Sequence, residues 1–235
     1  LGPAVFGPLF ADRDVEATAL TVPWLAAGGI SLIALVLVLL VRPDPKRIAE
    51  MLGSDERSTD AAPAAPLREL LARPGVRPAL LAALASFGVM VSVMNLSGYV
   101  VVEHHHHEQH DVFPIIGAHV LGMYALVLVV GSVIDRIGRI PALAGGLLVM
   151  AASTLGLLWI ESVAATALLL FGLGVGWNLS FVAATAQLAD ATAPAERGSL
   201  LGFSDLLSAL LGGGLALLGG YALDSIGVAA LALGA

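Results

Sequence analysis

Charged side chains in this chain are confined to a few short segments, and the stretches between them are long enough to cross a lipid bilayer. Between Asp111 and Asp135 lie 23 uncharged residues. Between Arg139 and Glu161 lie 21. A helix rises about 1.5 Å per residue, so about 20 apolar residues cross the hydrocarbon core, in which a charged side chain is costly. Both runs are therefore predicted to be membrane helices.

Four further runs follow from the same rule. Runs of 25, 25 and 28 uncharged residues are enclosed by Glu16 and Arg42, by Arg77 and Glu103, and by Glu161 and Asp190. A sixth span, from near Gly198 to about Ala222, is interrupted only by Asp205. The 11 residues after Asp224 are too few to cross, and the apolar stub at residues 1–10 has no initiating Met. We expect an all-α integral membrane fragment that is open at both ends.

Composition excludes several other classes of protein. The chain is 58% hydrophobic and 12% charged, whereas a soluble domain carries about 25% charged residues. It has no cysteine, which excludes a disulfide framework and a thiolate metal site. No basic stripe with interleaved aromatic residues indicates nucleic-acid binding. No catalytic motif or phosphate-binding glycine loop is present, so we expect neither an enzyme nor a bound cofactor.

Basic residues predict the orientation of the spans, because cytoplasmic loops retain Lys and Arg. Ten of the 11 basic residues fall on one side, and the exception is Arg13. The loops at 43–76, 135–139 and 190–197 are therefore predicted to be cytoplasmic. The first of these is long and rich in proline, and we interpret it as a linker between two helical bundles, with short helices at its flanks.

The turn between the uncharged runs 112–134 and 140–160 carries a recognisable pattern. It reads Gly-x-x-x-Asp-Arg-x-Gly-Arg-x-x-x-Leu, with Gly131, Asp135, Arg136, Gly138, Arg139 and Leu143 at its fixed positions. This pattern resembles the cytoplasmic loop signature of the major facilitator superfamily, which recurs between the second and third helices of each half of that fold. The segment 194–198, Pro-Ala-Glu-Arg-Gly, is similar to another segment of the family, and Gly2-Pro3 and Gly7-Pro8 resemble an element of helix five in exporters.

The resemblance implies a division of the chain into three parts. A long basic linker precedes the signature by two spans, as it does for the second copy in the family. Residues 1–42 would be the end of the N-terminal bundle, with part of helix 5 and helix 6, and residues 43–76 the cytoplasmic linker. Residues 77–235 would be the C-terminal bundle, with helices 7 to 11 and the start of helix 12. The first part of the N-terminal half would be missing.

The resemblance also implies a function. Members of the family move small solutes across a membrane by secondary active transport, through alternating access of a central site. For this chain we expect a multi-pass protein of the bacterial inner membrane, with protons as coupling ion and export as the direction that the Gly-Pro pairs favour. Its partners would be the lipid bilayer, a small-molecule substrate and the missing N-terminal half. The alternatives are a metal-ion permease and a non-transporting membrane scaffold or sensor.

The signature residues are predicted to form a gate. Asp135 would stand at the cytoplasmic end of a helix, where a carboxylate can cap a neighbouring helix and pair with an arginine. Making and breaking that contact would bias the equilibrium between two states. The predicted gating set is Gly131, Asp135, Arg136, Gly138, Arg139 and Arg197. The simpler alternative is that these residues only set topology and solvate a turn.

Polar residues inside the spans are candidates for proton and substrate binding. Asp205 is the only acid well inside a predicted span, and it is either a proton site or a structural hydrogen-bonding group. Asn178, with its neighbour Trp177, lies near the middle of its span. Both could line a substrate cavity, as could Asn95, although an amide at this depth also serves as a hydrogen-bonding link between helices.

Histidines gather in the loop at residues 103–111. The candidate metal ligands are His104, His105, His106, His107 and His110, together with His119 in the next helix. Imidazoles and carboxylates at this density suit Zn²⁺, Ni²⁺ or Cu²⁺. However, consecutive histidines cannot all point at one ion. We therefore prefer a polar external loop to a metal site.

Overall fold

The computed structural model of this protein describes residues 21–42, 48, 65–99, 101–102, 108 and 111–226. Within these ranges all the regular elements are helices, as the charge-free runs predicted. They fall into two compact units, one that contains the first described helix and one that starts at Ala65. The two units are described separately.

The first unit contains α2, which spans Thr21–Leu40. Its sequence carries no charged residue. The Ser31 hydroxyl donates to the Ala27 carbonyl at 2.9 Å, so this polar group is satisfied within its own helix. That arrangement suits a helix in lipid, where no water is available to pair with polar groups.

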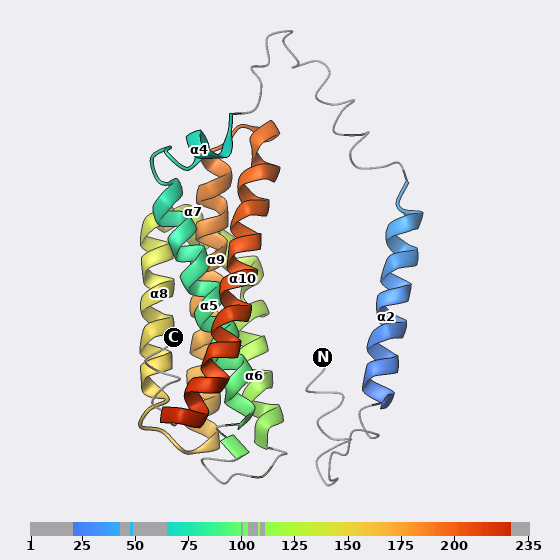
Figure 1. Ribbon diagram of the computed structural model, residues 1–235, viewed down its shortest axis with the longest axis vertical. Helices are drawn as coiled ribbons and strands as arrows, with labels where there is room; N and C mark the ends of the chain where they lie inside the picture. Colours follow the sequence, from blue (N-terminus) through green and yellow to red (C-terminus); the bar gives the residue numbers. More distant parts are fainter. Residues whose placement is uncertain are drawn as a thin grey trace. The chain divides into compact units, whose positions relative to one another are not determined.

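The second unit is a bundle of long helices preceded by a short one (Figure 1). Its elements are α4 (Leu67–Leu70), α5 (Val76–Tyr99), α6 (Val112–Tyr124), α7 (Val127–Ile137), α8 (Arg139–Gly156), α9 (Val163–Asp190) and α10 (Pro194–Ile226). Helix α9 packs against α5, α6 and α8, while α10 packs mainly against α5. By length and composition, four of the described helices can cross a membrane. If the bent pair α6 and α7 counts as one span, the described residues contain five.

Glycines let α9 approach its neighbours closely. A Cβ atom at Gly122 of α6 would lie 2.3 Å from the Phe171 carbonyl oxygen, and one at Gly174 would lie 2.4 Å from that of His119. On the other side of α9, a Cβ at Gly146 of α8 would lie 2.5 Å from the Ser180 nitrogen. Each added Cβ would clash with a backbone atom, which cannot move away by a rotamer change as a side chain can. Small residues therefore set the spacing of the bundle, as they commonly do in membrane helices.

One predicted span differs from the expectation. The single helix expected between Asp111 and Asp135 is two helices, α6 and α7, bent by 48° at the break between Tyr124 and Val127. No proline or glycine occupies positions 123–130, so the local sequence contained no signal for the break. The last span also begins at Pro194, a residue favoured in the first turn of a helix, rather than near Gly198.

Candidate functional site

Three arginines from three different segments converge on the C-terminal end of α9. Arg139 Nε donates to Asp190 Oδ2 at 3.1 Å. Arg73 Nη1 donates to the Ala191 carbonyl at 3.0 Å, and Arg197 Nε donates to the Ala189 carbonyl at 3.2 Å. The last carbonyls of a helix lack partners within the helix and carry partial negative charge, so cations are stabilised there. We call Arg73, Asp135, Arg139, Asp190, Glu196 and Arg197 the α9-terminus cluster.

Arg139 joins two carboxylates within this cluster. Its Nη1 lies 2.5 Å from Asp135 Oδ1 in addition to the contact with Asp190. Asp135 is on the last turn of α7 and Arg139 begins α8, with Gly138 between the helices at a φ of 92° that favours glycine. The predicted pairing of Asp135 with an arginine is thus present. The structure gives Asp135 this bond to Arg139, rather than a cap on the first turn of α8.

Both acids of this pairing are largely exposed, with 69% of the Asp135 side chain and 57% of the Asp190 side chain accessible. Exposed ion pairs contribute little to stability, typically about 0.2–1 kcal/mol. A contact of this kind can be broken and remade at small cost. That property suits a latch better than a permanent support.

Glu196 and Arg73 form the more enclosed ion pair of the cluster. Arg73 Nη1 lies 2.6 Å from Glu196 Oε2, and Nη2 lies 2.9 Å from Oε1. The carboxylate also accepts the backbone N–H groups of Ala193, at 2.9 Å, and of Ala65, at 3.2 Å. Glu196 therefore caps the first turn of α10 and fixes the chain before α4. The carboxylate raises the pKa of Arg73, which stays a cation.

This ion pair was missed by the sequence reasoning. Arg73 lies in the predicted linker 43–76, yet Leu70 and Val76 on either side of it are fully buried in the bundle core. The available signal was Glu196 itself, an acid just before the span predicted to begin near Gly198, because carboxylates are favoured at helix N-termini. Nothing in the sequence indicated that its partner lies 123 residues earlier.

The remaining signature residues lie outside these contacts. Arg136 is exposed. A Cβ atom at Gly131 would meet nothing within 4 Å in the described residues. Gly131 is therefore not required for packing of the described bundle, in contrast to Gly122.

Asp205 is separate from the α9-terminus cluster. Its side chain is exposed on α10, whereas Ser204 and Ser208 on the same helix are buried. Asp205 thus lies on the face of α10 that points away from the core of this bundle. The structural hydrogen bond considered for it is not present within the described part of the chain.

The two candidate substrate amides have different surroundings. Asn178 is 2% exposed, and its Nδ2 donates to the Met123 carbonyl of α6 at 2.6 Å. Trp177 stacks on Phe181, with ring centroids 5.1 Å apart. Asn95 is exposed and donates to the Val91 carbonyl of its own helix at 2.9 Å. The amide of Asn178 is thus engaged with a neighbouring helix, whereas that of Asn95 is satisfied locally.

The histidines give no metal centre in the described chain. His119 is 1% exposed and its Nδ1 lies 3.0 Å from the Leu170 carbonyl oxygen of α9. The residues that the structure describes contain no group of three His, Cys, Asp or Glu side chains able to hold a metal ion. His104, His105, His106, His107 and His110 lie outside the described residues.

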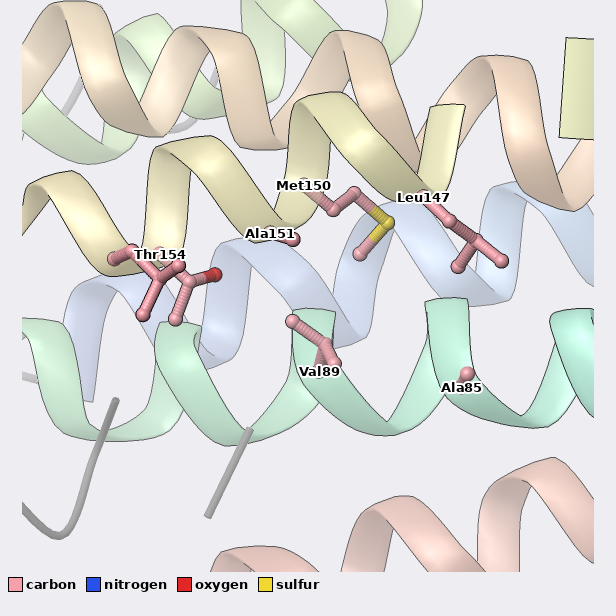
Figure 2. A pocket seen from close by; sticks show the side chains of 7 residues that line it. Ala85, Val89, Leu147, Met150, Ala151 and Thr154 are labelled. Atoms are coloured by element: carbon pink, nitrogen blue, oxygen red, sulfur yellow. The ribbon is translucent and has the colours of Figure 1, made fainter. Parts of the chain in front are cut away.

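A cavity of about 360 Å³ opens between α5 and α8 (Figure 2). It is lined by Ala85, Val89, Leu147, Met150, Ala151, Thr154 and Leu155. All of these are apolar except Thr154, whose buried hydroxyl has no hydrogen-bond partner among the described residues. None of the predicted site residues lines this cavity.

Comparison with known sequences gives a single family. The sequence profile described as Major Facilitator Superfamily matches residues 1–230. The MFS-type transporter YdeG of Bacillus subtilis is 31% identical over 191 residues, which cover 80% of this chain and 44% of the relative. YddS of the same organism, also described as an MFS-type transporter, is 28% identical over 208 residues, covering 86% and 47%.

A third relative has a named substrate. The riboflavin transporter RfnT of Brucella anthropi is 34% identical over 142 residues, which cover 60% of this chain and 35% of that protein. The chain therefore spans less than half the length of each of these relatives. No solved structure matches the chain.

Proposed function

Because this chain belongs to the major facilitator superfamily, we propose that the whole protein carries a small solute across the bacterial cytoplasmic membrane by alternating access. The chain contributes the helices on which one half of such a transporter is built. In this proposal it acts as a secondary transporter and not as an enzyme. The proposal rests above all on the α9-terminus cluster.

The cluster is proposed to act as the gate at the cytoplasmic end of this bundle. Its contacts join the chain before α5, the turn between α7 and α8, the end of α9 and the start of α10. The Arg73 to Glu196 pair holds the bundle end together in every state. The exposed contacts of Arg139 with Asp135 and Asp190 open and close, which biases the balance between inward-open and outward-open states.

Topology supports the same assignment of sides. The end of α7, the start of α8, the end of α9 and the start of α10 meet at one end of the bundle through these contacts. The loops at 43–76, 135–139 and 190–197 also hold most of the basic residues. By the positive-inside rule we place this end in the cytoplasm.

The proposal also names a proton-binding residue, a direction of transport and a first solute to test. Asp205 is the proposed proton site, because it is an acid inside an apolar helix and is free of structural contacts in the described bundle. We propose export by exchange with protons as the direction. Riboflavin is the first solute to test, since a relative that is 34% identical over 142 residues is named as a riboflavin transporter.

The experiment is solute flux in proteoliposomes that contain the complete protein. A panel of labelled solutes that includes riboflavin is loaded inside or outside, and a pH difference is imposed across the membrane. We expect flux of at least one solute, driven by the pH difference and abolished by a protonophore. Flux that ignores the pH difference would contradict proton coupling, and absence of flux for the whole panel would count against transport.

A further inference from the structure

We infer that Asn178 is a positioning residue for transport: its amide maintains the break between α6 and α7, and this break is a hinge on which α7 carries Asp135. The inference rests on the proposed transport function. It concerns a residue for which the sequence left two roles open, lining a substrate cavity or linking two helices by a hydrogen bond. In the structure its amide donates to a backbone carbonyl of the neighbouring helix.

The hydrogen bonds at the break define the hinge. In an unbroken helix the Met123 carbonyl would accept the N–H of Val127, four residues later. Here it accepts Nδ2 of Asn178 at 2.6 Å. The backbone hydrogen bonds of α6 end with the Ala125 N–H, which donates to the Leu121 carbonyl. Those of α7 begin at the Leu126 carbonyl, which accepts the N–H groups of Val129 and Val130. The Asn178 side chain thus donates the hydrogen bond that the Val127 N–H would donate in a continuous helix.

The cause of the bend is the inserted side chain. Sharp helix kinks arise at proline, at glycine or serine pairs, at π-bulges, or where a side chain enters the hydrogen-bond ladder. The sequence around the break, Met-Tyr-Ala-Leu-Val at 123–127, contains neither proline nor glycine. Gly122 and Gly174 bring α6 and α9 close enough for the short asparagine side chain to reach across.

The two sides of the break are held to different degrees. On the α6 side, Ile115, His119 and Met123 are buried, and His119 is bonded to the Leu170 carbonyl of α9. On the α7 side only Val130 and Ile134 are buried, while positions 124–129 are all exposed. Helix α6 is therefore anchored to α9, and α7 is the segment with fewer contacts to break when it moves.

This arrangement gives two discrete states. In the bent state the Met123 carbonyl is satisfied by Asn178, and in a straight state it would be satisfied by Val127. The Asn178 amide is buried, so losing its acceptor is unfavourable and the bent state is preferred. Because Asp135 lies on the last turn of α7, bending at the break moves the carboxylate that Arg139 binds. The hinge and the gate are thus mechanically linked.

The test measures distances between spin labels in the complete protein in liposomes, with any native cysteine removed. One pair joins Ile137, at the end of α7, to Leu206 on α10, and a reference pair joins Leu121 on α6 to the same Leu206. All three side chains are exposed. In Asn178→Ala we expect the first distance distribution to shift or split by several Å, while the reference distribution stays as in the parent.

Two further variants separate the hinge from a general loss of packing. Asn95→Ala removes an amide that bonds only within its own helix, and both distributions should stay unchanged. Val127→Pro removes the competing backbone donor at the first residue of α7, where proline is tolerated. Added to Asn178→Ala, it should restore the parent distribution. If Asn178→Ala alone does not fold, recovery of the parent distribution in this double variant remains the decisive result.

The inference is overturned by any of three outcomes. These are an unchanged Ile137 to Leu206 distribution in Asn178→Ala, an equal change in the reference pair, or a double variant in which the parent distribution does not return. The measurement needs no transported solute. A result that rejects the hinge is therefore distinguishable from one that rejects the transport proposal, because the flux experiment tests transport separately.

Discussion

Arg73 and Glu196 are 123 residues apart in sequence, and their side chains meet at two points, with N to O distances of 2.6 and 2.9 Å. The carboxylate accepts two backbone N–H groups as well. Two-point pairing between a guanidinium and a carboxylate is specific in geometry as well as favourable in energy. It fixes the chain that enters α5 against the start of α10, and this rigid support underlies the gate proposed beside it.

Replacing Glu196 by Gln should destabilise the bundle. The substitution keeps the shape of the side chain but removes the charge that pairs with Arg73 and one of the strong acceptors. We expect the midpoint of thermal unfolding in detergent to fall by about 3 °C or more. Asp205→Asn, which changes an exposed acid on α10 outside these contacts, is the matched control and should leave the midpoint unchanged. Equal midpoints for Glu196→Gln and the parent would contradict a structural role for the pair.

Breaking the Arg139 contacts should affect transport more than stability. Because Asp135 and Asp190 are largely exposed, we expect Asp190→Asn to shift the unfolding midpoint by at most about 2 °C. Solute flux should fall at least several-fold, since the latch between α8 and α9 is lost. Arg136→Ala, which alters an exposed arginine outside these contacts, serves as the comparison. If Asp190→Asn lowered the unfolding midpoint and left solute flux unchanged, the Arg139 contacts would be structural and not part of the gate.

Gly122→Ala should separate α6 from α9. The new Cβ would lie 2.3 Å from the Phe171 carbonyl oxygen, and backbone cannot move aside as a flexible side chain does. We expect a lower yield of folded protein and a lower unfolding midpoint. Gly145→Ala in α8 introduces a Cβ that meets nothing within 4 Å, so it should be neutral or slightly stabilising, because alanine favours helix. Comparable behaviour of the two variants would show that close packing at Gly122 is unimportant.

Asp205→Asn should abolish the dependence of flux on the pH difference without affecting folding. The side chain is exposed in the described bundle and takes no part in its core, so the unfolding midpoint should be preserved. The uncharged amide cannot bind and release a proton, so pH-driven flux should disappear while exchange of solute persists. Flux that still follows the pH difference in this variant would eliminate Asp205 as the coupling site.

Labelling of single cysteines tests the proposed orientation. The chain contains no cysteine of its own, so Arg136→Cys and Glu108→Cys each add one reactive group to it. A membrane-impermeant maleimide should label position 136 in inside-out vesicles and position 108 in intact spheroplasts. The reverse pattern would place the α9-terminus cluster on the outer side of the membrane and remove the basis for a cytoplasmic gate.

Much of the fold was predictable because the bilayer constrains it so strongly. A charged group is excluded from hydrocarbon and every backbone group must be paired inside it, so runs without charge become helices whatever lies around them. The positions of α5, α8 and α9 follow from this rule to within a few residues of the predicted runs. The turn at Gly138 and the pairing of Asp135 with an arginine followed from the signature for the same local reasons.

What the sequence could not provide is contact between distant segments. The break between α6 and α7 is imposed by Asn178, 55 residues later, and the local sequence from Met123 to Val130 contains no helix breaker. Likewise, the linker segment around Arg73 joins the bundle because Glu196 binds it. Charge spacing describes one helix at a time, and it was enough to predict that this chain crosses a membrane. The resemblance to the family came from the signature motif between Gly131 and Leu143. The bend in the α6–α7 span and the support for the gate were decided by tertiary packing, because a backbone carbonyl or a guanidinium acquires its partner only when the helices meet.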